Sequence, residues 1–266
     1  CALPICGEVA DAHDPSMAQG ASGRPGAGPV RPYAARRSME PVPIGLRWGA
    51  PAGAGSGPLG PVLGAVTVAT GASVLVLVGH RVIGAAPRAW LLVIGLGAWI
   101  ALIALGRRRG GLPIGPVLAG VALVLACAVV TPSTQSRDIA SYAMYGRMVT
   151  VHHHNPYDTA PAHFEGDPIR RMVSPMWQRT PDIYGPVFTA YMVAAAPLVG
   201  TDKLAIRLAY QLLALAAVAG VLGLCWRTTR SAVAVAFVGL CPVTAVSVVN
   251  GGHPDALVGL APPLLK

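Results

Sequence analysis

The stretch DIASYAMYGRMVTVHHHNPYDTAPAHFEGDPIRRMVSPMWQRTPDIYGP, residues 138–186, is a polar and aromatic island between long apolar runs. It holds five of the eleven acidic residues of the chain, whereas residues 58–131 hold none. The five are Asp138, Asp158, Glu165, Asp167 and Asp182. Because carboxylates are common acid–base groups, we expect any chemistry of this chain to lie in the island.

Apolar runs lie on both sides of the island. They cover about residues 59–79, 89–105, 112–130, 184–199, 204–226 and 232–249. A helix of about 20 apolar residues is long enough to cross a hydrocarbon core of about 30 Å. Only 12% of the residues are charged, against about 25% in soluble domains. The sequence therefore predicts an all-α fold, a polytopic transmembrane helical bundle in the cell membrane.

The domain organisation follows from this pattern. Residues 1–57 are rich in Gly, Pro, Ala, Ser and Arg without an apolar period, which predicts a disordered leader. Residues 58–266 form the predicted transmembrane region, with a large loop at 132–183. Arg107, Arg108 and Arg109 mark a cytoplasmic end, since arginine-rich short loops stay inside. The loop is then extracytoplasmic.

The side of residues 250–255 stays open at this point. Strict alternation of spans places Arg227 and Arg230 outside and residues 251–255 inside. A cytoplasmic Arg227 and Arg230 instead requires one apolar run, such as 184–199, to be re-entrant or to span only half of the membrane.

The net charge of +9 does not indicate nucleic-acid binding, because the arginines stand at the ends of apolar runs rather than among aromatic residues. Walker A, GxGxxG and Asp-x-Asp motifs are absent, which argues against a nucleotide donor. The consecutive residues His152, His153 and His154 favour a solvated loop; a metal site completed by Asp158 and His163 is the alternative. We expect no cofactor, with a divalent metal kept as an alternative.

Asp138 stands just beyond a predicted membrane helix, and two roles fit it. A partly buried carboxylate can serve as a general base, and Asp is also a good N-cap for the helix that follows. In that helix Ser141, Tyr142, Tyr145 and Met148 fall on related faces, which favours a helix lying at the membrane interface with tyrosines in the aromatic belt.

Other island residues carry weaker signals. Arg147 suits either a substrate phosphate or lipid headgroups, Asn155 and Pro156 indicate a turn, and Tyr157 suits a sugar ring. Trp177 fits a sugar platform or, more readily, an interface anchor. Six further charges of the island are expected to be mostly solvated: Asp158, Glu165, Asp167, Arg170, Arg171 and Arg179. After Tyr184, Gly185 and Pro186 are expected to start a helix that re-enters the membrane.

Beyond the island, Arg207 lies within an apolar run, where it serves either a phosphate or, by snorkelling, the interface. His253 and Asp255 follow two glycines in NGGHPDAL, residues 250–257. Two titratable groups beside flexible backbone make this segment a second candidate for the site.

These motifs in order resemble a known family. SYAMYGRM (141–148), HNPYD (154–158), TPDIYGPVF (180–188) and NGGHPDAL together are similar to GT-C membrane glycosyltransferases. They most resemble the actinobacterial polyprenol-phosphomannose-dependent alpha-(1→6)-mannosyltransferases that build lipomannan and lipoarabinomannan cores. That family has ten or more helices, so this chain would be a truncated copy.

The resemblance implies a function and roles for residues. Asp138 would be the catalytic base of an inverting transfer from polyprenyl-phosphomannose to a glycolipid or mannan acceptor. Arg147 or Arg207 would steady the leaving phosphate. The sugar and acceptor cleft would be lined by Tyr142, Asn155, Tyr157, Tyr184, His253 and Asp255.

Two other classes of protein stay open. A transporter or flippase of lipid-linked or polar substrates would use Arg207 and Asp255 as charges in the middle of the membrane. A non-catalytic membrane protein is the third interpretation. Asp138→Asn separates them, because only the enzyme would lose turnover.

Overall fold

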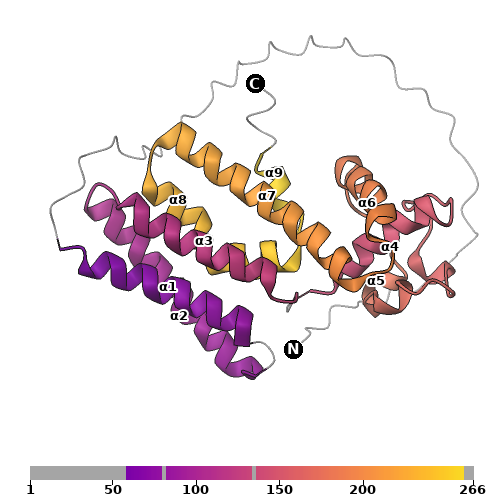
Figure 1. Ribbon diagram of the computed structural model, residues 1–266, viewed down its shortest axis with the longest axis horizontal. Coiled ribbons are helices and arrows are strands. Elements are labelled where there is room, and N and C mark those ends of the chain that lie inside the picture. The colour runs from indigo at the N-terminus through magenta and orange to yellow at the C-terminus, as the bar shows by residue number, and fades with distance from the viewer. Residues whose placement is uncertain (1–57, 80–81, 134–135, 261–266) are drawn as a thin grey trace, which may run out of the picture. The chain divides into compact units, whose positions relative to one another are not determined.

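The computed structural model describes residues 58–79, 82–133 and 136–260, which belong to one compact unit, Leu46–Lys266. The predicted disordered leader, residues 1–57, lies outside the described residues. Within the described residues every regular element is helical and no strand occurs, which confirms the all-α prediction (Figure 1).

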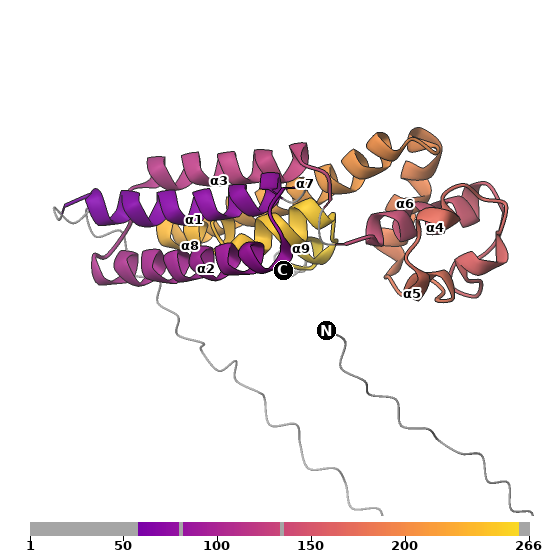
Figure 2. The ribbon, with the colours of Figure 1, turned by 90° about the horizontal axis from the view of Figure 1, so that it is seen from below.

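The first three apolar runs form helices α1 (Gly60–Val78), α2 (Ala85–Arg108) and α3 (Ile114–Val130). They lie side by side, with α1 packed on both α2 and α3 (Figures 1 and 2). By length and apolar composition, α1, α2 and the later α7 (Lys203–Thr229) are able to cross a membrane. The structure therefore has the character of a helical membrane bundle.

Helix α4 (Asp138–Thr150) begins the island and packs on α6 (Pro186–Val199). Gly146 of α4 lies directly against the backbone carbonyl of Met192, so the two helices approach closely. Tyr142 and Tyr145 are at most 1% exposed. The prediction that these tyrosines anchor α4 in the aromatic belt is therefore wrong, because α6, α7 and the rest of the island cover the helix.

The apolar run at 232–249 was expected to form one helix, and that prediction is wrong. Helix α8 (Ala232–Gly239) ends before Pro242, and a π-helical segment, η4 (Thr244–Val249), follows. Proline has no N–H for the helical ladder and its ring clashes with the preceding turn. The indole N–H of Trp99 on α2 points at the carbonyls of Ala236 and Phe237, at 3.3 and 3.1 Å, and so satisfies the end of α8.

Contacts between helix ends show which ends lie on the same side of the bundle. At one end of the bundle Gly106 of α2 lies against Leu112, which precedes α3, and Val233 of α8. We call this the arginine-rich end, because the last turns of α2 and α7 and the residues that follow them carry five arginines. They are Arg107, Arg108, Arg109, Arg227 and Arg230. No acidic residue lies in the two short connections at this end, residues 106–113 and 227–231.

At the opposite end of the bundle the start of α7 meets the end of α3. Arg207 Nη1 donates a hydrogen bond to the carbonyl of Val130, the last residue of α3, at 3.3 Å. Helix α6 has only 14 residues, or about 21 Å at 1.5 Å per residue, which is short of a hydrocarbon core of about 30 Å. This supports the half-spanning alternative: Arg227 and Arg230 share an end with Arg107, whereas residues 250–255 share an end with the island.

Candidate functional site

Asp138 is the first residue of α4, and its carboxylate is held from two sides. Oδ1 accepts a hydrogen bond of 2.9 Å from the indole Nε1 of Trp177, and Oδ2 lies 3.8 Å from Nδ1 of His253. The side chain keeps 21% of its surface exposed. Asp138 is therefore both positioned and reachable.

The alternative prediction that Asp138 caps α4 is wrong. The N-cap position belongs to Arg137, and no side chain caps the helix there. The N–H of Asp138 is bound by the hydroxyl of Ser136 at 3.0 Å, and the Asp138 carboxylate turns instead toward Trp177.

Tyr142, one turn further along α4, joins three elements. Its hydroxyl lies 3.2 Å from Nδ1 of His253 and accepts a hydrogen bond of 3.3 Å from the hydroxyl of Tyr184. Burial raises the pKa of Tyr142 well above its usual value. The neighbouring Tyr184, Asp138 and Asp255 raise it further. The phenol therefore stays protonated and can donate to His253.

His253 reaches this site because of the segment before it. Gly252 has φ +65°, a conformation that favours glycine, and a β-carbon there would lie only 3.0–3.1 Å from Ile139 and Tyr210. The amide of the fully buried Asn250 donates to the carbonyls of Ala128 and Thr131, at 2.9 and 3.1 Å, at the end of α3. These contacts fix the backbone that carries His253.

A cavity of about 560 Å³ opens beside Tyr184 and His253. Its polar groups are Tyr184, His253 and Asp255, the last at the start of α9 (Asp255–Val258). Apolar side chains supply most of the remaining wall: Pro186, Val187, Phe188, Pro254, Leu257 and Val258. The cavity thus combines a polar end next to Asp138 and Tyr142 with an apolar wall.

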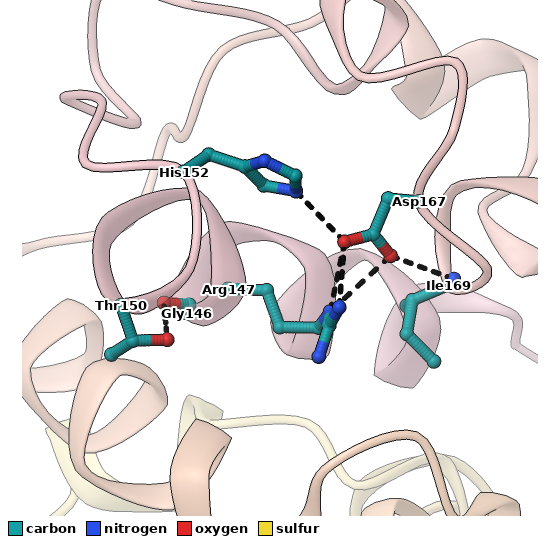
Figure 3. Close-up of polar contacts among 6 residues, drawn as sticks. All are labelled: Gly146, Arg147, Thr150, His152, Asp167 and Ile169. Carbon is teal, nitrogen blue, oxygen red and sulfur yellow. Dashed lines mark hydrogen bonds and ion pairs between the residues drawn. The ribbon is translucent and has the colours of Figure 1, made fainter.

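Arg147 is engaged within the island (Figure 3). Its Nε and Nη2 atoms bind the carboxylate of Asp167 at 3.0 and 2.8 Å, and Nε2 of His152 lies 2.8 Å from the same carboxylate. Asp167 also accepts the N–H of Ile169 at 2.8 Å, and its side chain is 1% exposed. The prediction of a solvated Asp167 is wrong, because the fold brings an arginine and a histidine to it.

This arrangement also sets the protonation of Asp167. Burial alone would raise the pKa of its carboxyl, but the hydrogen bonds from Arg147 and His152 outweigh burial and lower it below its usual value. Asp167 therefore stays charged at neutral pH and holds the guanidinium of Arg147. The buried pair fastens the island onto α4.

The other predicted site residues lie in separate contacts. Asn155 Oδ1 accepts the N–H of Tyr157 at 3.1 Å, which confirms the predicted turn. The hydroxyl of Tyr157 donates to Thr189 of α6 at 2.8 Å, and Arg207 lies in the second turn of α7 beside Val130. The structure thus brings together Asp138, Tyr142, Tyr184 and His253, with Asp255 on the shared cavity; Asn155, Tyr157, Arg147 and Arg207 make other contacts.

The site contacts of two residues were not foreseen from the sequence. Trp177 was assigned to a platform or an anchor, and the sequence gives no signal that it meets Asp138. Asp182 is 5% exposed, and it accepts the N–H of Tyr184 at 2.9 Å and the hydroxyl of Thr189 at 2.8 Å. Burial raises the pKa of its carboxyl. Asp182 therefore fixes the backbone that presents Tyr184 to the cavity.

The histidine run makes protein contacts. His152 binds Asp167, and the ring of His154 lies edge-on to Phe164. Nδ1 of His163 lies 3.1 Å from the carbonyl of Ala160. In the described part of the chain, no three His, Cys, Asp or Glu residues are grouped so that they could hold a metal ion.

The chain matches a family model described as "Alpha-(1->6)-mannopyranosyltransferase, N-terminal domain" over residues 50–262. The match includes every helix named above and the whole island. No match was found among curated proteins or among solved structures.

Proposed function

Because the chain belongs to the alpha-(1→6)-mannopyranosyltransferase family, we propose that it transfers mannose from polyprenyl-phosphomannose to a glycolipid or mannan acceptor. The proposed acceptor is a core of the lipomannan and lipoarabinomannan type. The proposed transfer inverts the anomeric carbon, as in a GT-C glycosyltransferase.

The position of Asp138 is the observation that carries this proposal. One oxygen of its carboxylate accepts the indole N–H of Trp177, and the other is left facing His253. In the proposed reaction this second oxygen takes the proton of an acceptor hydroxyl as that hydroxyl attacks the anomeric carbon. The bond from the sugar to the phosphate breaks at the same time, and polyprenyl phosphate leaves with the electron pair. Attack from the opposite face inverts the configuration.

The cavity supports a lipid-linked donor. Its apolar wall, including Val187, Phe188 and Leu257, suits an isoprenoid chain, and His253 and Asp255 suit sugar hydroxyls. The absence of nucleotide-binding motifs from the sequence agrees with a lipid carrier. Since Arg147 is held by Asp167, Arg207 is the arginine that we propose for the leaving phosphate, although it does not line this cavity and its Nη1 donates to the carbonyl of Val130.

The arrangement of the two ends supports an extracytoplasmic site. The arginine-rich end has short, acid-free connections and is assigned to the cytoplasm by the positive-inside rule. The island and residues 250–255 gather at the other end of the bundle. We therefore propose a multi-pass protein of the cell membrane whose catalytic loop, residues 132–183, faces outward.

The transporter alternative finds less support. It requires Arg207 and Asp255 in the middle of membrane spans. Arg207 instead lies in the second turn of α7, next to the last residue of α3, and Asp255 begins a four-residue helix.

The test is sugar transfer in membranes that contain the protein, with labelled polyprenyl-phosphomannose as donor. Asp138→Asn should lower the rate about 10²- to 10⁴-fold, the range typical of a lost general base. Glu165→Gln, a change of the same kind at an exposed carboxylate of the island, should leave the rate unchanged.

Transfer that survives in Asp138→Asn would remove Asp138 as the base and direct attention to Asp255. A wild-type protein that inserts into the membrane but transfers no mannose would contradict the proposed donor.

A further inference from the structure

We infer that Trp177 is a positioning residue that orients the Asp138 carboxylate for proton transfer; the inference rests on the proposed function. The indole Nε1 of Trp177 lies 2.9 Å from Oδ1 of Asp138. An indole N–H has one proton and can only donate. This hydrogen bond engages Oδ1, and Oδ2, to which the described structure gives no hydrogen bond, is the oxygen that we assign to receive a proton.

The structure builds this contact from both sides. Trp177 lies on α5 (Pro175–Gln178), a single turn that is braced by the side chain of Gln178, which donates to the carbonyl of Val173 at 3.0 Å. Directly after this turn, the carbonyl of Thr180 accepts the hydroxyl of Tyr145 at 2.9 Å.

Tyr145 and Asp138 are seven residues apart on α4, so they lie on one face of that helix. Helix α4 thus carries both the carboxylate and the phenol that fastens the segment holding Trp177. Burial raises the pKa of Tyr145, so its hydroxyl remains a donor. The contact between Trp177 and Asp138 is therefore fixed at three points: the start of α4, the middle of α4 and α5.

A fixed donor matters because the terminal torsion of an aspartate is broad and leaves the carboxylate free to rotate. A hydrogen bond to a charged oxygen is shorter and stronger than a neutral one, and it restricts that rotation. A base must present its free oxygen to the acceptor hydroxyl at hydrogen-bonding distance. Loss of the indole N–H should therefore slow proton transfer without changing how polyprenyl-phosphomannose binds.

The experiment compares Trp177→Phe, which keeps an aromatic ring without the N–H, with Trp177→His, which restores a ring N–H. Trp90→Phe on α2 is the matched control, because Trp90 is 67% exposed. For each protein, kcat and KM for polyprenyl-phosphomannose and the midpoint of thermal unfolding are measured. The indole N–H resonances of ¹⁵N-tryptophan-labelled protein are recorded with and without Asp138→Asn.

We expect Trp177→Phe to lower kcat about 10- to 100-fold, the effect of losing a hydrogen bond to a charged group. KM and the unfolding midpoint should stay close to the wild-type values, and Trp177→His should recover part of kcat. An unchanged kcat in Trp177→Phe would overturn the inference, as would a loss that parallels a lower unfolding midpoint.

The NMR arm separates this inference from the proposed function. If the wild-type protein transfers no mannose, the proposed function fails, and with it the role of Trp177 in transfer. A shift of the Trp177 indole resonance on Asp138→Asn would still support the contact itself. An unshifted resonance would overturn the contact whether or not the protein transfers mannose.

Discussion

Nδ1 of His253 lies 3.2 Å from the hydroxyl of Tyr142, although 111 residues separate the two in the chain. The same hydroxyl accepts a hydrogen bond from Tyr184, which precedes α6. Tyr142 thus connects the segment after η4, the segment before α6 and helix α4. Two of its neighbours, Tyr184 and His253, line the cavity.

Tyr142→Phe should therefore reduce mannose transfer about tenfold while the protein remains folded. The ring keeps its edge-on packing against Tyr184 and Phe188, but His253 and Tyr184 lose their partner. A single hydrogen bond contributes about 1 kcal/mol net to stability, so the unfolding midpoint should fall only a little. Transfer rates and thermal unfolding in detergent measure the two effects.

Tyr191→Phe is the control for this change. The Tyr191 hydroxyl donates to the carbonyl of Ala209 at 2.7 Å, between α6 and α7. A similar loss of stability with an unchanged transfer rate is expected. Equal losses of transfer in the two variants would mean that the Tyr142 hydroxyl has no special role at the site.

Asp167→Asn should destabilise the protein by about 3–5 kcal/mol, because it leaves a buried guanidinium without its counter-charge. The side chains of Arg147 and Asp167 are 12% and 1% exposed, so water can replace the lost partner only in part. Thermal unfolding measures the effect, and Glu165→Gln on the exposed surface of the island is the control. An unchanged midpoint would show that Arg147 is not held by this pair and restore it as a candidate for the phosphate.

The apolar helices were predictable because their signal is local. The runs at 112–130 and 204–226 became α3, Ile114–Val130, and α7, Lys203–Thr229. The break in the run at 232–249 was missed although Pro242 was a signal for it. The prediction used apolar composition alone, which does not take into account that a proline lacks the N–H needed in a helix interior.

The candidate site was only partly predictable, because its contacts join residues that are distant in sequence. Asp138, Tyr142, Tyr184 and His253 were named from their chemistry and from the family resemblance, and the structure brings them together. No local sequence pattern predicts that Asp167 binds Arg147 or that Trp177 donates a hydrogen bond to Asp138. Those pairings depend on how the loop folds back over α4.

Asp182 predicts a specific dependence of stability on pH. Burial raises the pKa of its carboxyl above the ordinary value of 3.8. The folded state then binds the proton more tightly than the unfolded state, so the unfolding free energy falls as pH rises through the raised pKa. As the pH rises through the raised pKa, the wild-type protein should therefore lose stability relative to Asp182→Asn.

Thermal unfolding of both proteins from about pH 4 to about pH 7 tests this prediction. The control is Glu165→Gln, which changes an exposed carboxylate of the island rather than a buried one. A constant difference between wild type and Asp182→Asn across the range would contradict the raised pKa.

Gly146→Ala tests the close approach of α4 and α6. A β-carbon at Gly146 would overlap the backbone carbonyl of Met192 and lie 3.1 Å from the side chain of Ala196. Because a backbone carbonyl cannot rotate away, the helices must separate, and we expect a loss of about 1–3 kcal/mol. Since α4 carries Asp138, transfer should fall as well. Gly97→Ala on α2, where nothing lies within 4 Å of the added carbon, should not destabilise the protein, because alanine favours a helix interior more than glycine does. Equal effects of the two substitutions on the unfolding midpoint would argue against this helix contact.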